Sequence, residues 1–164
     1  MAVGVLLRRV TPAEVSRGIG HLEEGFEATM DDDVFEAQAA DGILCSLGRD
    51  WLFVQLALTG ELHDGGGPED LVVFGGQMLG QVGPTDRDVV IVLPPDGVAA
   101  AAEYLRGVDP TASLSRHRAA LAGRTGGLLP DTFLAGIKDY LESLRRFYAA
   151  AAEAGDAVAK RTYS

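Results

Sequence analysis

The chain has few of the residues that mark secreted or membrane-bound proteins. Its single cysteine, Cys45, cannot form an internal disulfide, which is typical of a protein in a reducing cytosol. No run of 18 or more apolar residues is present, so the sequence predicts no membrane-spanning helix. The first segment, MAVGVLLRRV, places its basic pair after the apolar run, which is not the order of a secretory signal. We therefore expect a cytoplasmic protein without a membrane partner.

Positive charge is also scarce. The chain carries 14 Lys and Arg against 24 Asp and Glu, a net charge of −10. Such a surface repels phosphate backbones, so we expect no nucleic-acid partner. The same field attracts basic protein surfaces, although a negative charge is also ordinary in soluble cytosolic proteins. The partners that we expect are a protein with a basic surface or a second copy of the chain.

Patterns for metal binding and catalysis are missing as well. Histidines at 21, 63 and 117 have no i,i+4 partner, so no zinc site is predicted. The chain has no G-x-S-x-G turn of a serine hydrolase. The acidic run 31–33 lacks the spacing of a calcium loop and is typical of a helix N-terminus, where negative charge offsets the helix dipole. We expect neither a metal nor another cofactor, and an enzyme is the less favoured interpretation.

The clearest structural pattern that is present lies in residues 130–156. Apolar residues recur there at alternating steps of three and four, which predicts one amphipathic helix of about 34 Å at ~1.5 Å per residue. Asp131 is placed to cap its N-terminus and Gly155 to end it in a left-handed conformation. The residues of the apolar stripe are Leu134, Ile137, Leu141, Leu144, Tyr148 and Ala151.

A second helix is predicted over 44–60, LCSLGRDWLFVQLALTG. It is apolar on nearly all sides, which indicates a helix enclosed by the domain and packed against the 130–156 helix. Gln55 is the one polar residue at its centre, and a buried amide needs hydrogen-bond partners. We expect it to bond to the backbone of a neighbouring element; the alternative is that it lines a pocket beside Trp51.

The remaining segments complete an α+β pattern. Strands are predicted over 3–10, 71–74, 89–93 and 157–163, with 89–93 inside the sheet. One or two acidic helices are predicted over 23–41, and another helix begins at 94–98. Gly75 and Gly76 are interpreted as turn or hairpin glycines because no phosphate-loop lysine follows them. The expected fold is a single compact domain over 1–164, with a small mixed sheet packed against several helices and a long C-terminal helix.

Several short segments, taken together and in their order along the chain, form a specific pattern. They are VGVLLRRVTPAEV (3–15), SLGRDWLFVQLALTG (46–60), FGGQMLG (74–80), LPPDGV (93–98), DP (109–110), LLPDTF (128–133) and YLESLRRFYAAAAEAGDAV (140–158). Over essentially its whole length the sequence thereby resembles the bacterial YfbM-like family (DUF1877), a domain of unknown function. The resemblance implies a compact α+β domain of the bacterial cytosol and supplies no reaction, cofactor or catalytic residue.

The sequence departs from the family's usual pattern at three places. Leu47-Gly48-Arg49 stands where Leu-Asp-Lys is usual, and Gln55 stands where histidine is common. Pro94-Pro95 replaces a Thr-Pro start. If the family's aspartate and histidine form a site in relatives, this chain has lost half of it.

Two hypotheses about function follow from the sequence. The first is a non-enzymatic binding protein whose acidic surface, including Asp31, Asp32 and Asp33, contacts a protein partner; an immunity-like role that masks a basic toxin belongs to this class. The alternative is a small-molecule-binding protein or enzyme with a pocket near Trp51 and Gln55. A cavity that reaches Gln55, with polar groups converging on it, would favour the alternative. The residues that we expect to bind such a ligand are Arg49, Trp51, Gln55, Gly75 and Gly76.

Overall fold

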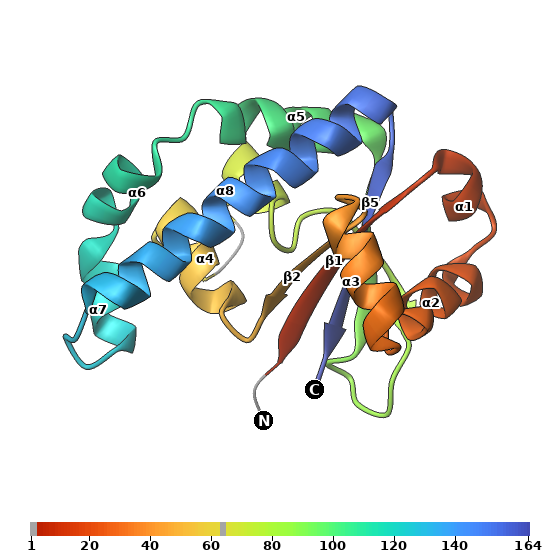
Figure 1. Cartoon of the computed structure of the whole chain (residues 1–164), viewed down its shortest axis with the longest axis horizontal. Coiled ribbons are helices and arrows are strands. Elements are labelled where there is room, and N and C mark those ends of the chain that lie inside the picture. The colour runs from red at the N-terminus through yellow and green to blue at the C-terminus, as the bar shows by residue number, and fades with distance from the viewer. Residues whose placement is uncertain (1–2, 63–64) are drawn as a thin grey trace.

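The centre of the fold is a sheet whose middle strand is the C-terminal segment of the chain. In the computed structural model, which describes residues 3–62 and 65–164, the sheet has five strands in the order β2-β1-β5-β4-β3 (Figure 1). Strand β5 pairs along its length with β1, from Gly4 opposite Tyr163 to Val10 opposite Ala157. The strands are β1 (Gly4–Val10), β2 (Leu44–Gly48), β3 (Gln77–Gln81), β4 (Val89–Leu93) and β5 (Ala157–Tyr163).

The predicted α+β class is confirmed, but the sheet is antiparallel throughout rather than mixed. All four strand pairs are antiparallel within the described residues. The helical connections from β1 to β2 and from β4 to β5 each return to the end of the sheet that they left, so the next strand runs back beside its neighbour. Strand β4 lies inside the sheet, between β5 and β3, as predicted.

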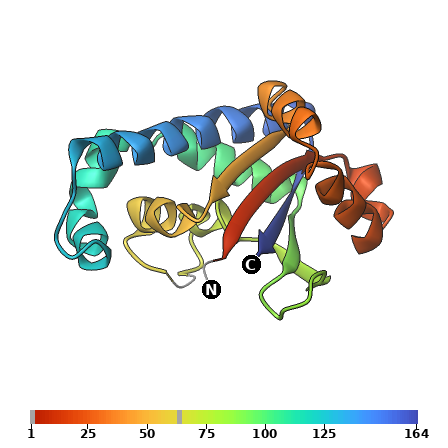
Figure 2. The same ribbon diagram turned by 60° about the horizontal axis from the view of Figure 1, so that its bottom comes forward.

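The helices form two groups, one on each face of the sheet. Successive side chains of a strand point to opposite faces, so Leu6 packs with Leu22 and Phe26, whereas Leu7 joins the core beneath α8. Figures 1 and 2 show α1–α3 on one side of the sheet and α4–α8 on the other. The helical elements are α1 (Pro12–Ser16), α2 (Ile19–Ala28), α3 (Asp32–Ala40), α4 (Trp51–Thr59), the 3-10 helix η1 (Pro68–Leu71), α5 (Pro95–Arg106), α6 (Pro110–Arg116), α7 (Arg118–Arg124) and α8 (Asp131–Ala154).

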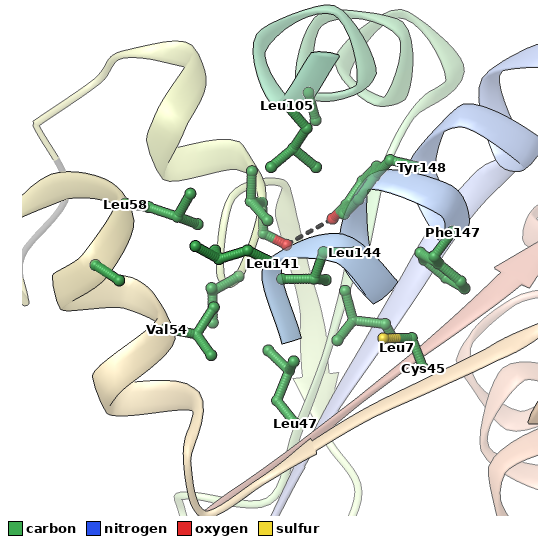
Figure 3. Close-up of a cluster of buried hydrophobic side chains, with 14 of the residues drawn as sticks. Leu7, Cys45, Leu47, Val54, Leu58, Leu105, Leu141, Leu144, Phe147 and Tyr148 are labelled. Atoms are coloured by element: carbon green, nitrogen blue, oxygen red, sulfur yellow. Dashed lines mark hydrogen bonds between the residues drawn. The ribbon is translucent and has the colours of Figure 1, made fainter. Parts of the chain in front are cut away.

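Helices α4 and α8 pack together, which confirms the prediction for the core. Val54 and Leu58 of α4 belong to the same buried cluster as Leu141 and Leu144 of α8 (Figure 3). The hydroxyl of Tyr148, also on α8, donates to the backbone oxygen of Val72 at 2.6 Å and ties the helix to the segment after η1. Helix α8 thus holds α4 and that segment against the sheet.

Three local predictions were wrong or incomplete. Residues 44–48 form an edge strand paired with β1, so the helix predicted over 44–60 begins only at Trp51. Residues 71–74 are not a strand: Leu71 ends η1 and a turn follows, because the Gly75 N–H closes back onto the oxygen of Asp70. Strand β3 was not predicted. Within the described ranges, no helix combines the length and apolar content needed to cross a bilayer.

Candidate functional site

A cavity lies where α4 and η1 meet the end of the sheet. Its volume is about 390 Å³, within the range of small-molecule sites. Gln55 enters from α4, Asp70 from η1, Gly75 from the following turn, and Ile91 and Thr162 from strands β4 and β5. Elements that are distant in the sequence therefore bring polar groups to one hollow.

Gln55 is buried at the edge of this cavity, with 4% of its surface exposed. Its Nε2 atom donates to Asp70 Oδ1 at 3.3 Å and to Thr59 Oγ1 at 3.4 Å, so its partners are side chains and not the backbone that we expected. No described residue donates a hydrogen bond to its Oε1 atom, which is shielded from solvent. A buried acceptor without a donor lowers the stability of the folded protein by about 1–3 kcal/mol, so the unpaired Oε1 atom is unfavourable for folding.

Asp70 determines the orientation of the Gln55 amide. Its Oδ2 atom accepts from the backbone N–H groups of Gly65 and Gly67, at 3.1 and 3.3 Å, while Oδ1 faces Gln55. An ionised carboxylate accepts hydrogen bonds and donates none, so the Nε2 side of the amide must face it. The Oε1 side of Gln55 is thereby left as an acceptor.

Lys160 lies on the same face of β5 as Thr162 and beside Ile91 of β4. It is fully buried, and its Nζ atom donates to the backbone oxygens of Leu71 and Gly75, the latter at 2.7 Å. These bonds fix the turn that carries Gly75 into the cavity wall. Burial lowers the pKa of Lys160 well below its ordinary value of 10.5.

Because of this buried amine, we expect protein stability to rise with pH in the alkaline range. Between the lowered pKa and 10.5, the unfolded chain holds a proton on Lys160 that the folded chain does not. The loss in the free energy of unfolding that results from burying this amine is complete below the pKa of Lys160 in the folded protein. It disappears as the pH approaches 10.5, with a slope of about 1.4 kcal/mol per pH unit in between. Denaturant unfolding of the wild type and of Lys160→Met across this range measures it. The difference in free energy between the two proteins should change with that slope, and parallel curves would contradict the assignment.

The predicted ligand-binding residues are only partly brought together. Gln55 and Gly75 line the cavity, whereas Arg49, Trp51 and Gly76 do not. Arg49 is exposed in the turn before α4. Trp51 donates from Nε1 to the oxygen of Val3 at 2.7 Å, and its ring meets that of Phe74, a cavity residue, edge-on with centroids 4.8 Å apart.

Three residues of the site were missed in the sequence: Asp70, Lys160 and Thr162. Asp70 had a weak signal, because it stands three residues after Gly67 where a helix-capping acid is favoured. Lys160 had none, since a lysine in a strand ordinarily indicates an exposed position.

Cys45 is not placed for nucleophilic chemistry. It is buried in the core with Leu7 and Leu47 (Figure 3), and burial raises the pKa of its thiol to about 12. Of the histidines, His63 lies outside the described residues. Across residues 3–62 and 65–164, no group of three or more His, Cys, Asp or Glu side chains is arranged to hold a metal ion.

The acidic run has a local structural role. Asp31 caps α3, and its Oδ1 atom accepts from the N–H groups of Asp33 and Val34 at 3.0 and 3.2 Å. Asp32 and Asp33 follow in the first turn, where their charge complements the helix dipole. All three are exposed, and their contact with a protein partner stays a prediction.

Known proteins that are similar to this chain show its family and its fold, but they assign no activity. The model of the family described as "Domain of unknown function (DUF1877)" matches residues 1–159. The chain is similar to the crystal structure of a protein of unknown function, YfbM from Escherichia coli, with 15% identity and a TM-score of 0.66. That match covers 98% of this chain and 99% of the other, and at this identity it shows the fold alone. No curated protein matches the chain.

Proposed function

The chain belongs to the DUF1877 family, a domain of unknown function, and from the geometry of its own site we propose that it binds a small molecule in the cavity beside Gln55. The observation that carries the proposal is Gln55, which lines a hollow of about 390 Å³ and whose buried Oε1 atom no described residue pairs. Because Oε1 is shielded from solvent in the free protein, the Gln55 side chain has to shift slightly toward the cavity before a ligand donor meets this atom and supplies the missing hydrogen bond.

The surroundings of Gln55 are suited to binding. The apolar side chains of Phe74 and Ile91 form part of the wall, and a few polar groups from separate elements converge between them. The site rests on rigid parts of the fold: α4 is packed beneath α8, and Lys160 anchors the turn at Gly75. Apolar walls with few, well-held polar groups are typical of small-molecule sites.

Two other hollows of the molecule support binding less well. One, of about 540 Å³, lies between α3, β2 and α8; no buried side chain at that place, among the described residues, lacks a hydrogen-bond partner. The other, of about 470 Å³, contains Arg161, whose Nε atom is also unpaired. The guanidinium of Arg161 already forms an ion pair with Glu27 at 2.6 Å, so its charge is satisfied within the chain.

A screen of small polar metabolites against the folded protein tests the proposal. A ligand present at a hundred times its Kd stabilises the protein by about 2.7 kcal/mol, which corresponds to roughly 5–10 °C in Tm for a chain of this size. Because Trp51 is the single tryptophan and touches Phe74 of the cavity wall, its fluorescence provides an independent signal. We expect Gln55→Leu to weaken binding of the hits about fivefold to tenfold through loss of one hydrogen bond.

Gln81→Leu is the matched control. It makes the same chemical change at an exposed position of β3 that does not line the cavity, so hits should bind it as they bind the wild type. A screen without hits, or hits that bind the Gln55→Leu protein equally well, would refute the proposal. The hypotheses of a basic protein partner, an immunity-like role or a second copy of the chain stay predictions, since capping of α3 already accounts for the acidic run.

A further inference from the structure

The charges around the cavity identify the chemical class of the ligand. Resting on the function proposed above, we infer that the site selects a molecule carrying a primary ammonium group, which donates to Gln55 Oε1 and lies in the field of Asp70. Asp70 fixes the polarity of the Gln55 amide. Because Asp70 holds its Nε2 side, the free atom accepts only, and a ligand group without an N–H or O–H cannot satisfy it.

The Asp70 carboxylate is held without a positively charged side chain from the described residues. It is buried, with 7% of its surface exposed, and its donors among the described residues are neutral: two backbone N–H groups and the amide of Gln55. None of the ion pairs found among the described residues involves Asp70. A buried negative charge without a paired cation favours a positive ligand over a neutral one of the same shape.

The other charged residues that line the cavity, Asp86 and Arg87, carry opposite charges. Their charges cancel, so the described wall keeps the formal charge of −1 that Asp70 contributes. An ammonium bound at Oε1 is a few ångströms from Asp70, because both ends of one amide group connect them. An anionic ligand at the same place meets the Asp70 carboxylate across the amide, so anions are disfavoured.

Four probes with a common six-carbon chain separate charge from hydrogen bonding. They are hexylamine, its N,N,N-trimethyl derivative, hexan-1-ol and hexanoate. Titrations at pH 7, followed by Trp51 fluorescence and calorimetry, measure each Kd. We expect hexylamine to bind about tenfold more tightly than hexan-1-ol, since a charge-assisted hydrogen bond is stronger than a neutral one by roughly that factor. The trimethyl derivative keeps the charge but has no N–H, so it should bind no better than hexan-1-ol.

Variants connect the preference to the named residues. Gln55→Leu should bring the Kd values of hexylamine and hexan-1-ol to within about threefold of each other, as expected when only the more distant charge remains. Asp86 lies at an exposed loop position, so Asp86→Asn should not affect folding. This variant should weaken the binding of hexylamine about twofold and leave the Kd of hexan-1-ol unchanged.

The outcomes distinguish this inference from the function on which it rests. If hexan-1-ol or hexanoate binds as tightly as hexylamine, and Gln55→Leu weakens it, the cavity binds small molecules but the ammonium class is wrong. Equal binding of hexylamine and its trimethyl derivative would likewise overturn the role of Oε1. If no probe binds and the metabolite screen is also empty, both fail together.

Discussion

Leu144→Ala is expected to lower the free energy of unfolding by about 3–5 kcal/mol, the largest loss that we expect from a single side chain of this protein. Leu144 is fully buried at the centre of α8, in the same cluster as Val54 of α4 and Leu7 of β1 (Figure 3). Truncation removes the transfer free energy of the deleted atoms and leaves a cavity that three packed elements cannot readily close.

The matched control is Leu128→Ala. Leu128 has 73% of its surface exposed in the loop before α8, so the same truncation there should change stability by less than about 0.5 kcal/mol. Urea unfolding at fixed pH measures both variants, with unchanged m-values showing that the transition is the same. A loss below about 1.5 kcal/mol for Leu144→Ala would show that α8 is not the packing centre of the domain.

How far the sequence predicts this fold depends on how long each pattern is. Helix α8 was predicted nearly to its ends because its apolar stripe repeats over 24 residues, and Gly155 ends it with a φ of 70° as expected. Asp131 proved to be the first helical residue, with Pro130 at the capping position and no side-chain cap. Strand β2 was merged with α4 because a short apolar run is compatible with either state, and its pairing partner β1 is some forty residues away in the sequence.

Tertiary contacts explain the remaining differences. Residues Leu71 to Phe74 have strand-forming side chains, but Val72 and Val73 are buried in the core and the turn is held by Lys160 and Tyr148. Strand β5 has a weak alternating pattern because Lys160 occupies a fully buried position, yet it is the centre of the sheet. Long-range contacts of this kind override local propensity.

The candidate site was predictable only in part, because some of its residues are brought there by long-range contacts. A lone glutamine inside an apolar helix signals a buried amide from the sequence alone, so Gln55 was found. In the sequence Asp70 closely follows the glycine-rich segment 65–67, where an acidic residue is ordinarily exposed, and its burial depends on the approach of η1 to α4. The cavity arises from this meeting of non-local elements, which no single stretch of sequence records.

Gly76→Ala is the second substitution for which we expect a large effect, a loss of about 2–4 kcal/mol in the free energy of unfolding. Gly76 has a φ of 131°, which side chains rarely tolerate, and it lies where the chain enters β3. A Cβ atom at this position would stand 2.5 Å from the backbone oxygen of Val92 and 2.8 Å from its carbonyl carbon. Backbone strain and overpacking each cost about 1–3 kcal/mol, and neither backbone can move without disturbing the pairing of β3 with β4.

Gly18→Ala separates these two contributions. Gly18 also has a positive φ, 92°, but nothing lies within 4 Å of the position that a Cβ would occupy, so this variant carries the backbone strain alone. Thermal and urea unfolding of both variants should show the larger loss for Gly76→Ala. Equal losses would mean that β3 shifts to make room for the added methyl group, in which case Gly76 is required for its conformation and not for the approach of β4.

The two variants should also differ in ligand binding. Because Gly75, the neighbour of Gly76, lines the cavity, the Gly76→Ala protein should bind the ligand of the Gln55 site more weakly. Gly18 lies on the opposite face of the sheet, so Gly18→Ala should leave that affinity unchanged.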